Sequence, residues 1–241
     1  MLRLYTASVP KEGLEEEENE DALRVASFAK EGEIVGAIAD GATESAQAAK
    51  WSQAICDHLL ASHGREAVFT AGLSTLRQEW QRDTTPRSEE LPWFVERKRR
   101  EGDYAAFRGL TIAKDTWSTF GCGDCLLFRI SSGYPHQWFP GHLDSESILE
   151  RPLLLSSDAL AISPRLAVDS GELRLGDEFV LCTDALAAWI LWRLDLGETP
   201  FAILKEALEQ DRFLSLISDL RKSKNMKNDD TSVMWICPTS T

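Results

Sequence analysis

Apolar residues along the chain fall into short runs and helical repeats, and these predict the strands and helices. Short apolar runs, typical of strands, occupy residues 22–25, 33–39, 107–113, 117–121, 126–130, 136–139, 173–175, 179–183 and 232–237. Apolar residues at helical spacing occupy residues 51–59, 69–80, 185–194, 199–208 and 213–221, and a short helix is expected after residues 88–92. Strands and helices come in blocks and do not alternate regularly. This order predicts a layered α+β fold.

Length and composition narrow the class of protein. The chain has 241 residues, of which 43% are hydrophobic, and no low-complexity linker interrupts it, so one domain spanning residues 1–241 is expected. No apolar run reaches the roughly 18–20 residues that span a bilayer, and the first residues lack the apolar segment of a secretion signal. Five cysteines, an odd number, favour reduced thiols and a cytoplasmic location. The net charge of −13 argues against binding to nucleic acids or anionic membranes.

Carboxylates gather where apolar strands begin or end. Hard divalent cations take oxygen ligands and neutralise clustered acids, so these residues could form one metal-binding centre. Asp and Gly are also common in turns, and scattered structural turns are the alternative interpretation. The segments that share this design are Asn19-Glu20-Asp21, Asp40-Gly41, Thr183-Asp184 and Asp229-Asp230.

The order and local context of these segments resemble a known family. Residues 13–21 are similar to a stretch that ends in Asn-x-Asp, and residues 38–42 (IADGA) to a Val-Ala-Asp-Gly segment. Residues 120–126 (FGCGDCL), 180–186 (VLCTDAL) and 227–233 (KNDDTSV) resemble the family's Gly-Asp-Ser, Ser/Thr-Asp-Gly-Leu and Asp-Asn-x-Thr-Val segments. The family is the PPM (protein phosphatase 2C-like) group of metal-dependent Ser/Thr protein phosphatases, in its compact bacterial branch. The blocks occur in family order along nearly the whole chain.

The resemblance implies a four-layer αββα sandwich and a site for two Mn²⁺ or Mg²⁺ ions. Carried over position by position, Asp40 would bridge both ions and the carbonyl of Gly41 would bind one of them. Asp184 and Asp229 would hold the first ion. A hydroxide held between the ions would attack the phosphorus of a phosphomonoester in line. Asp40 and Asp184 are therefore the expected catalytic residues, and a phosphoprotein would be the substrate.

The second ion and a third one depend on other acids. The resemblance implies that Asp21 holds the second ion directly or through water, with Glu20 beside it. A third metal site in the family uses the acid at Asp124 together with an acid four residues after the Asp184 position. Here that residue is Ala188, so we expect the third site to be absent or impaired.

Two positions depart from the family pattern. The family commonly has an Arg that binds phosphate where this chain has Glu16, and a carboxylate there repels phosphate. Lys11 or Arg3 could substitute for it. Ala42 stands where some relatives have a His that protonates the leaving group, a role that water could take.

These departures leave three functional classes open. The first is an active phosphatase whose partners are a phosphorylated protein and a cognate Ser/Thr kinase. The second is a weak or inactive PPM-like pseudophosphatase that acts as a regulatory binding module, and the third is another metal-dependent hydrolase that clusters carboxylates. In each case we expect a monomer without nucleic-acid or membrane partners.

Other conspicuous residues have simpler explanations. Cys122 and Cys125 form a lone C-x-x-C, which we interpret as a strand turn and not as a zinc or redox site. The basic residues 97–100 are expected on a solvated helix face. Lys227 precedes Asp229 in what we expect to be a solvated loop, although it could attract a phosphorylated substrate.

Overall fold

Two antiparallel β-sheets form the centre of the protein. The computed structural model describes residues 2–29, 32–84, 102–141, 143–149 and 152–238. Within them, sheet A has the strand order β1 (Leu2–Val9), β11 (Thr231–Pro238), β10 (Asp177–Cys182), β6 (Leu126–Ser131), β7 (Tyr134–Phe139). Sheet B has the order β2 (Asp21–Phe28), β3 (Glu33–Gly41), β4 (Tyr104–Ile112), β5 (Thr116–Cys122), β9 (Ala167–Glu172), with β8 (Leu155–Ser156) paired to β4.

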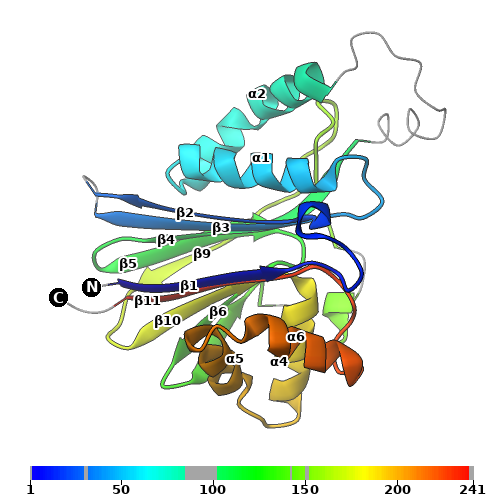
Figure 1. The fold of residues 1–241 in the computed structure, drawn as a ribbon. Helices are drawn as coiled ribbons and strands as arrows, with labels where there is room; N and C mark the ends of the chain where they lie inside the picture. The colour runs from blue at the N-terminus through cyan, green and yellow to red at the C-terminus, as the bar shows by residue number, and fades with distance from the viewer. Residues whose placement is uncertain (1, 30–31, 85–101, 142, 150–151, 239–241) are drawn as a thin grey trace.

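Helices cover the outer face of each sheet (Figure 1). Helices α1 (Ala48–Ala61) and α2 (Glu66–Thr84) lie on sheet B, and α4 (Asp184–Asp195), α5 (Pro200–Glu209) and α6 (Phe213–Lys222) lie on sheet A. Two short 3-10 helices, η1 (Glu16–Glu18) and η2 (Ser147–Leu149), lie in connecting segments. The four-layer αββα sandwich is therefore confirmed. Of the described helices, none is long and apolar enough to cross a membrane.

Alternating side chains explain why β3 reads as a continuous apolar run. Val35, Ala37 and Ala39 pack in the core beneath α1 and α2, whereas Ile38 packs between the two sheets. Both faces of the strand are therefore buried, so apolar residues are needed at successive positions. Phe179 of β10, in the other sheet, belongs to the same layer between the sheets as Ile38.

Most of the expected elements are confirmed, and three strands differ. The strand expected at residues 173–175 lies earlier, as β9 (Ala167–Glu172), and residues 173–176 lead into β10. Strand β9 is at the edge of sheet B and largely exposed, so its sequence lacks the apolar signal of a buried strand. Strands β1 (Leu2–Val9) and β8 (Leu155–Ser156) were not predicted. The short helix expected after residues 88–92 and the basic residues 97–100 lie outside the described residues.

The cysteines are free thiols. All five are buried and unpaired. Cys122 packs in the core beneath α1 and α2, and Cys125 packs between the sheets. The two side chains thus lie in different layers of the core, and Gly123, with a φ of 81°, makes the turn between β5 of sheet B and β6 of sheet A. The turn interpretation of the C-x-x-C is confirmed.

Candidate metal centre

The predicted acids gather at one end of the sandwich, opposite the chain termini (Figure 1). The antiparallel register of β2 and β3 places Asp21 directly opposite Asp40. Asp184 begins α4 two residues after β10 ends, and Asp229 lies just before β11. The charges of Asp21, Asp184 and Asp229 all act on Asp40. Strand pairing therefore brings together four acids that are up to about 200 residues apart in the sequence.

Asp21 is buried, with 8% of its surface exposed. Its Oδ2 accepts a hydrogen bond from Thr183 Oγ1 at 3.0 Å, and Thr183 Oγ1 accepts one from the backbone amide of Ser232 at 3.0 Å. Its Oδ1 is buried without a hydrogen-bond partner. Burial, together with the nearby charges of Asp230 and Asp184, raises the pKa of Asp21 well above its usual value. Thr183 thus ties β2 to the ends of β10 and β11.

The other central carboxylates are also hard to ionise. Burial and the negative charges of Asp21 and Asp184 raise the pKa of Asp40 well above its usual value. Burial and the charge of Asp184 raise the pKa of Asp124 to about 7. Burial also raises the pKa of Asp184, whose Oδ1 is buried without a hydrogen-bond partner. Such groups gain stability when positive charge is placed among them.

Two lysines lie among these acids. The Lys11 ammonium is 3.0 Å from Glu20 Oε2 and 3.1 Å from Asp229 Oδ1. The Lys227 ammonium is 2.5 Å from Asp229 Oδ2 and 3.6 Å from Asp184 Oδ2. Burial alone would raise the pKa of Asp229, but the hydrogen bonds from Lys227 and Lys11 outweigh it and hold that pKa below its usual value. Lys227 lies in an exposed loop, as expected, but its ammonium also pairs with acids of the site, so both lysines belong to it.

The backbone beside Lys11 is fixed by an acid of the same site. The Lys11 amide donates to Asp230 Oδ1 at 2.8 Å, and the Glu20 amide donates to Asp230 Oδ2 at 2.9 Å. Glu20 Oε2 also accepts from Thr43 Oγ1 at 2.8 Å. Asp230 thereby ties the segment after β1 to the start of β2, and the ammonium of Lys11 is directed at the acids.

Glu16 and Arg3 lie elsewhere. Glu16 is on η1, beside β1 and β2, and its carboxylate makes no hydrogen bond or ion pair with a described residue. Arg3 is opposite Cys237, near the other end of β1. Eight residues of extended chain, roughly 26 Å, separate Arg3 from Lys11. Of the two cations proposed to compensate for Glu16, Lys11 is the one that reaches the acids.

A close contact with α1 positions the loop after β3. A Cβ on Gly41 would lie 2.8 Å from the carbonyl oxygen of Ala48 and 2.8 Å from Ser52 Oγ. The loop is fixed further along by buried Asp103, which accepts hydrogen bonds from the Gln47 amide at 2.8 Å and from Trp80 Nε1 at 3.1 Å. Gly41 is thus required by packing, whatever its carbonyl binds.

The donor set fits a hard divalent cation. The available groups are carboxylate oxygens and the Gly41 carbonyl, which are the ligands that Mn²⁺ and Mg²⁺ prefer. The buried, unpartnered Oδ1 atoms of Asp21 and Asp184 offer acceptors that the protein does not use. In the described part of the chain, no three His, Cys, Asp or Glu side chains are spaced as metal ligands. Lys11 and Lys227 supply the positive charge in this arrangement, so ligation requires side-chain rearrangement.

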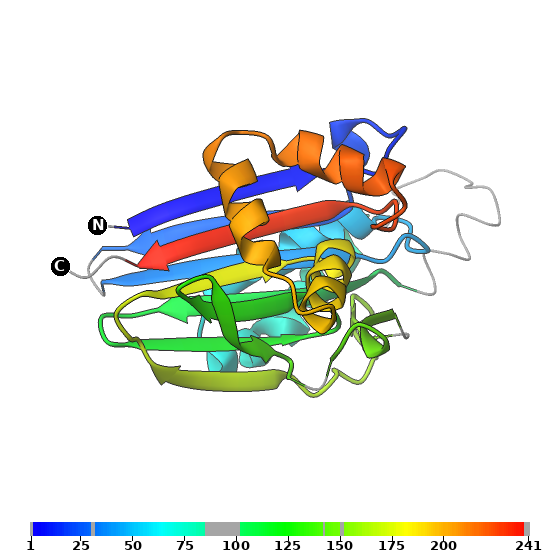
Figure 2. The same cartoon turned by 90° about the horizontal axis from the view of Figure 1, so that it is seen from below.

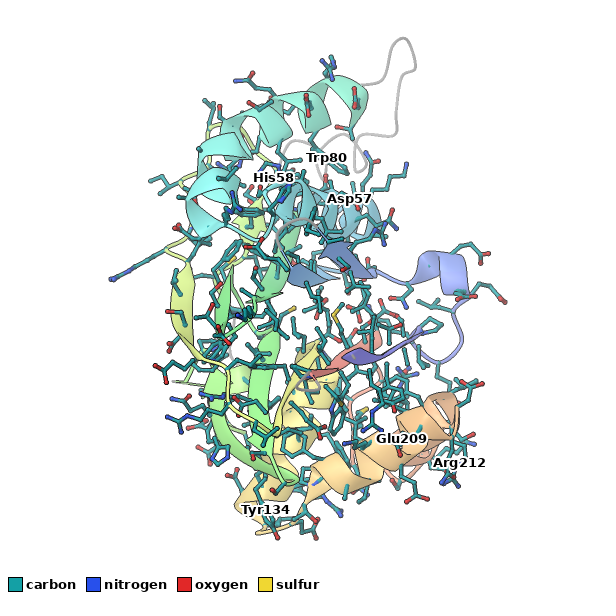
Figure 3. The ribbon with its side chains drawn as sticks, turned by 90° about the vertical axis from the view of Figure 1, so that its left-hand side faces the viewer. Asp57, His58, Trp80, Tyr134, Glu209 and Arg212 are labelled. Atoms are coloured by element: carbon teal, nitrogen blue, oxygen red, sulfur yellow. The ribbon has the colours of Figure 1, made fainter. Side chains whose placement is uncertain are left out.

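The described histidines do not contribute to this centre. His58 lies on α1 in the helical layer over sheet B (Figure 3), where its Nε2 is 3.0 Å from the carbonyl oxygen of Phe69. His63 stacks on Phe28 with ring centroids 4.1 Å apart. His136 is on β7, in the opposite sheet.

Comparison with known proteins gives a structural match. No protein-family model and no curated protein matches the sequence. The serine/threonine phosphatase PstP/Ppp of Mycobacterium tuberculosis is 17% identical over 99% of each chain, with a TM-score of 0.67. Stp1 of Staphylococcus aureus, also a serine/threonine phosphatase, is 12% identical over 100% of this chain and 96% of its own, with a TM-score of 0.68. The PstP catalytic domain in complex with 2 manganese ions is 19% identical over 99% of each chain, with a TM-score of 0.58.

Proposed function

We propose that this chain, which has the fold of the PPM-type Ser/Thr phosphatases, is a metal-dependent phosphoprotein phosphatase. The observation that carries the proposal is the group of buried acids at the strand ends. Their pKa values are raised, and two of their oxygens lack partners. Similar solved structures are serine/threonine phosphatases, and one of them holds 2 manganese ions.

The residues that would hold the cations are those predicted from the strand ends. Asp40, the Gly41 carbonyl, Asp184 and Asp229 would hold one ion, and Asp21, which is paired with Asp40 in the β2–β3 register, would hold the other. Glu20 and Asp124 lie at the edge of this group and are further candidates. When bound, two Mn²⁺ or Mg²⁺ ions would lower the pKa of water and neutralise charge on the phosphoryl oxygens. The protein contributes acids whose backbone positions are set by the β2–β3 register and by the ends of β10 and β11.

Lys11 is our candidate for binding the substrate phosphate. Its side chain is 17% exposed, so it lies at the rim of the site and reaches both the acids and solvent. Once the acids are otherwise neutralised, its ammonium can donate to a phosphoryl oxygen. Lys227, with a side chain that is 61% exposed, can do the same from the other side of Asp229. These two cations compensate for the carboxylate at Glu16, and they favour an active enzyme over a pseudophosphatase.

The proposed partners are a phosphorylated protein and the Ser/Thr kinase that produces it. The acids lie at one end of the sandwich, where a phosphorylated side chain of another protein can reach them. Such a substrate does not require a closed cleft. We place the protein in the cytoplasm as a monomer.

The test is release of phosphate from a phosphothreonine peptide with and without Mn²⁺. The wild type should turn over only with the metal, and Asp40→Asn should reduce kcat by a factor of about 10³ or more. Asp57→Asn is the matched control, because Asp57 is an exposed acid on α1 that pairs with Arg24. Metal-independent turnover, or none from a folded wild type, would refute the proposal. The second result would leave a non-catalytic binding module.

A further inference from the structure

Arg108 is a buried cation without an acidic partner. It lies on β4 between Ala106 and Leu110, which pack between the two sheets, and it is 0% exposed. Its Nε donates to the Cys125 carbonyl at 3.2 Å and its Nη1 to the Ala167 carbonyl at 3.2 Å. Its Nη2 has no hydrogen-bond partner. Within the described ranges, no carboxylate forms an ion pair with it.

Two other buried arginines lie beside acids. Arg129 also extends between the sheets, over Trp117, and pairs with Asp177 Oδ2 at 2.6 Å. Arg221 lies beside the charge of Asp230. A buried charge without a partner is costly, and an anion next to it offsets much of that cost. Arg108 therefore has the chemistry of a binding group that lacks its counterion.

Arg108 is among the residues that line two cavities at the edge of the sandwich where β7 and β9 lie. Their volumes are about 280 Å³ and about 500 Å³, and both are also lined by the exposed Arg165. The first has apolar walls that include Leu143 and Ile148. The second is lined by Phe139, at the end of β7. These volumes suit a small ligand, and two guanidinium groups among apolar walls are a common arrangement for binding an organic anion.

The two cavities share Arg108 and Arg165, and together we call them the Arg108 cavity. We propose that the Arg108 cavity binds a small organic oxyanion, which is a carboxylate or phosphate group on a compact apolar body. The planar guanidinium offers N–H donors in a fork that matches two oxygens of such a group. Burial lowers the pKa of Arg108 to about 10, so the side chain remains charged at neutral pH. Asp124 also lines the smaller cavity, so this cavity shares a residue with the candidate metal centre.

The test is calorimetric titration of the metal-free protein, in EDTA, with benzoate and with inorganic phosphate. Benzoate should bind saturably and more tightly than phosphate, because it also fills the apolar part of the cavity. Arg108→Met, which keeps side-chain length without charge, should weaken benzoate binding about tenfold or more. Lys11→Gln, at the metal centre, should leave it unchanged. An absence of saturable benzoate binding, or equal affinity in Arg108→Met, would overturn the proposal.

A second variant covers the case in which Arg108→Met does not fold. Arg165 is exposed, so Arg165→Gln changes no core contact, and it should weaken benzoate binding roughly two- to fivefold. Unchanged affinity in this variant would contradict the assigned site. The measurement needs neither metal nor turnover, so it succeeds or fails independently of the proposed phosphatase activity. Asp40→Asn should lose turnover and keep benzoate binding.

The oxyanion could be a free molecule or an acidic side chain of the protein substrate. Two phosphothreonine peptides that differ by a neighbouring Glu or Gln distinguish these sources, and this arm rests on the proposed function. A lower KM for the Glu peptide that disappears in Arg165→Gln identifies the substrate side chain. Equal KM values, with benzoate binding retained, identify a free anion. If the wild type neither binds benzoate nor has a lower KM for the Glu peptide, the proposal is overturned.

Discussion

Burial and neighbouring negative charges make the carboxylate of Asp40 hard to ionise. Asp40 is surrounded by the charges of Asp21, Asp184, Asp124 and Asp229, and its pKa is raised by burial and by that repulsion. We therefore predict that Asp40→Asn stabilises the metal-free protein at pH 7.5, because the neutral amide removes the repulsion among these carboxylates. The Tm in EDTA should rise by roughly 2–4 °C, the change that about 1 kcal/mol produces in a protein of this size. A lower Tm than the wild type in EDTA would show that the Asp40 charge is already compensated.

Lys11 allows a prediction with a control on the same strand edge. Lys11→Gln removes a charge-assisted hydrogen bond to the substrate phosphate, and KM for a phosphothreonine peptide should rise about tenfold or more with a smaller change in kcat. Arg3→Gln makes the same change of charge near the far end of β1, where Arg3 is opposite Cys237, and KM should not change. Equal KM values for the two variants would remove Lys11 from substrate binding.

At the scale of elements, the contact between β3 and α1 explains a required glycine. A Cβ at Gly41 would meet backbone atoms of Ala48 at 2.8 Å, and backbone cannot rotate away as a long side chain can. Gly41→Ala should therefore lower the free energy of unfolding by about 1–3 kcal/mol and displace the start of α1. Denaturant unfolding measures the first effect. Gly141→Ala is the control, because its nearest neighbour would be 3.4 Å away, and its stability should change little.

The elements also show which features a sequence can predict. Strand β3 was predicted because both its faces are buried, which makes its apolar run continuous. Strand β9 was misplaced because it is an exposed edge, held by backbone pairing with β5 that leaves little trace in side-chain polarity. The acids could be predicted from the sequence because they stand at strand ends. The position of Lys11 among them could not be predicted. A hydrogen bond from its backbone amide to Asp230, 219 positions away, orients it.

At the scale of the whole molecule, one end of the sandwich and one of its edges differ in chemistry. Figure 2 shows β1 and β2 along one side of the sandwich and β9 along the other. The acids of the candidate metal centre lie at one end of the sandwich, and the Arg108 cavity lies at the β7–β9 edge. The net charge of −13 is therefore not spread evenly, because the fold brings several carboxylates close enough to repel one another at the strand ends.

That repulsion predicts a pH dependence. The pKa values of Asp21, Asp40 and Asp184 are raised, and that of Asp124 is about 7, so the folded state binds more protons than the unfolded state. The stability of the metal-free protein should therefore fall as pH rises from about 4 to beyond about 7. The Tm in EDTA should be lower at pH 7.5 than at pH 5.5. Mg²⁺ should raise the Tm more at pH 7.5, and a Tm that increases with pH in EDTA would contradict this.

The central claim is that strand ends assemble buried acids into a divalent-cation centre. The most direct measurement is calorimetric titration of the metal-free protein with Mn²⁺ at pH 7.5, for the wild type and for Asp40→Asn. The account predicts saturable binding of two ions to the wild type and a loss of at least about tenfold in affinity in the variant. An absence of Mn²⁺ binding to the folded wild type, or the same affinity in Asp40→Asn, would contradict it.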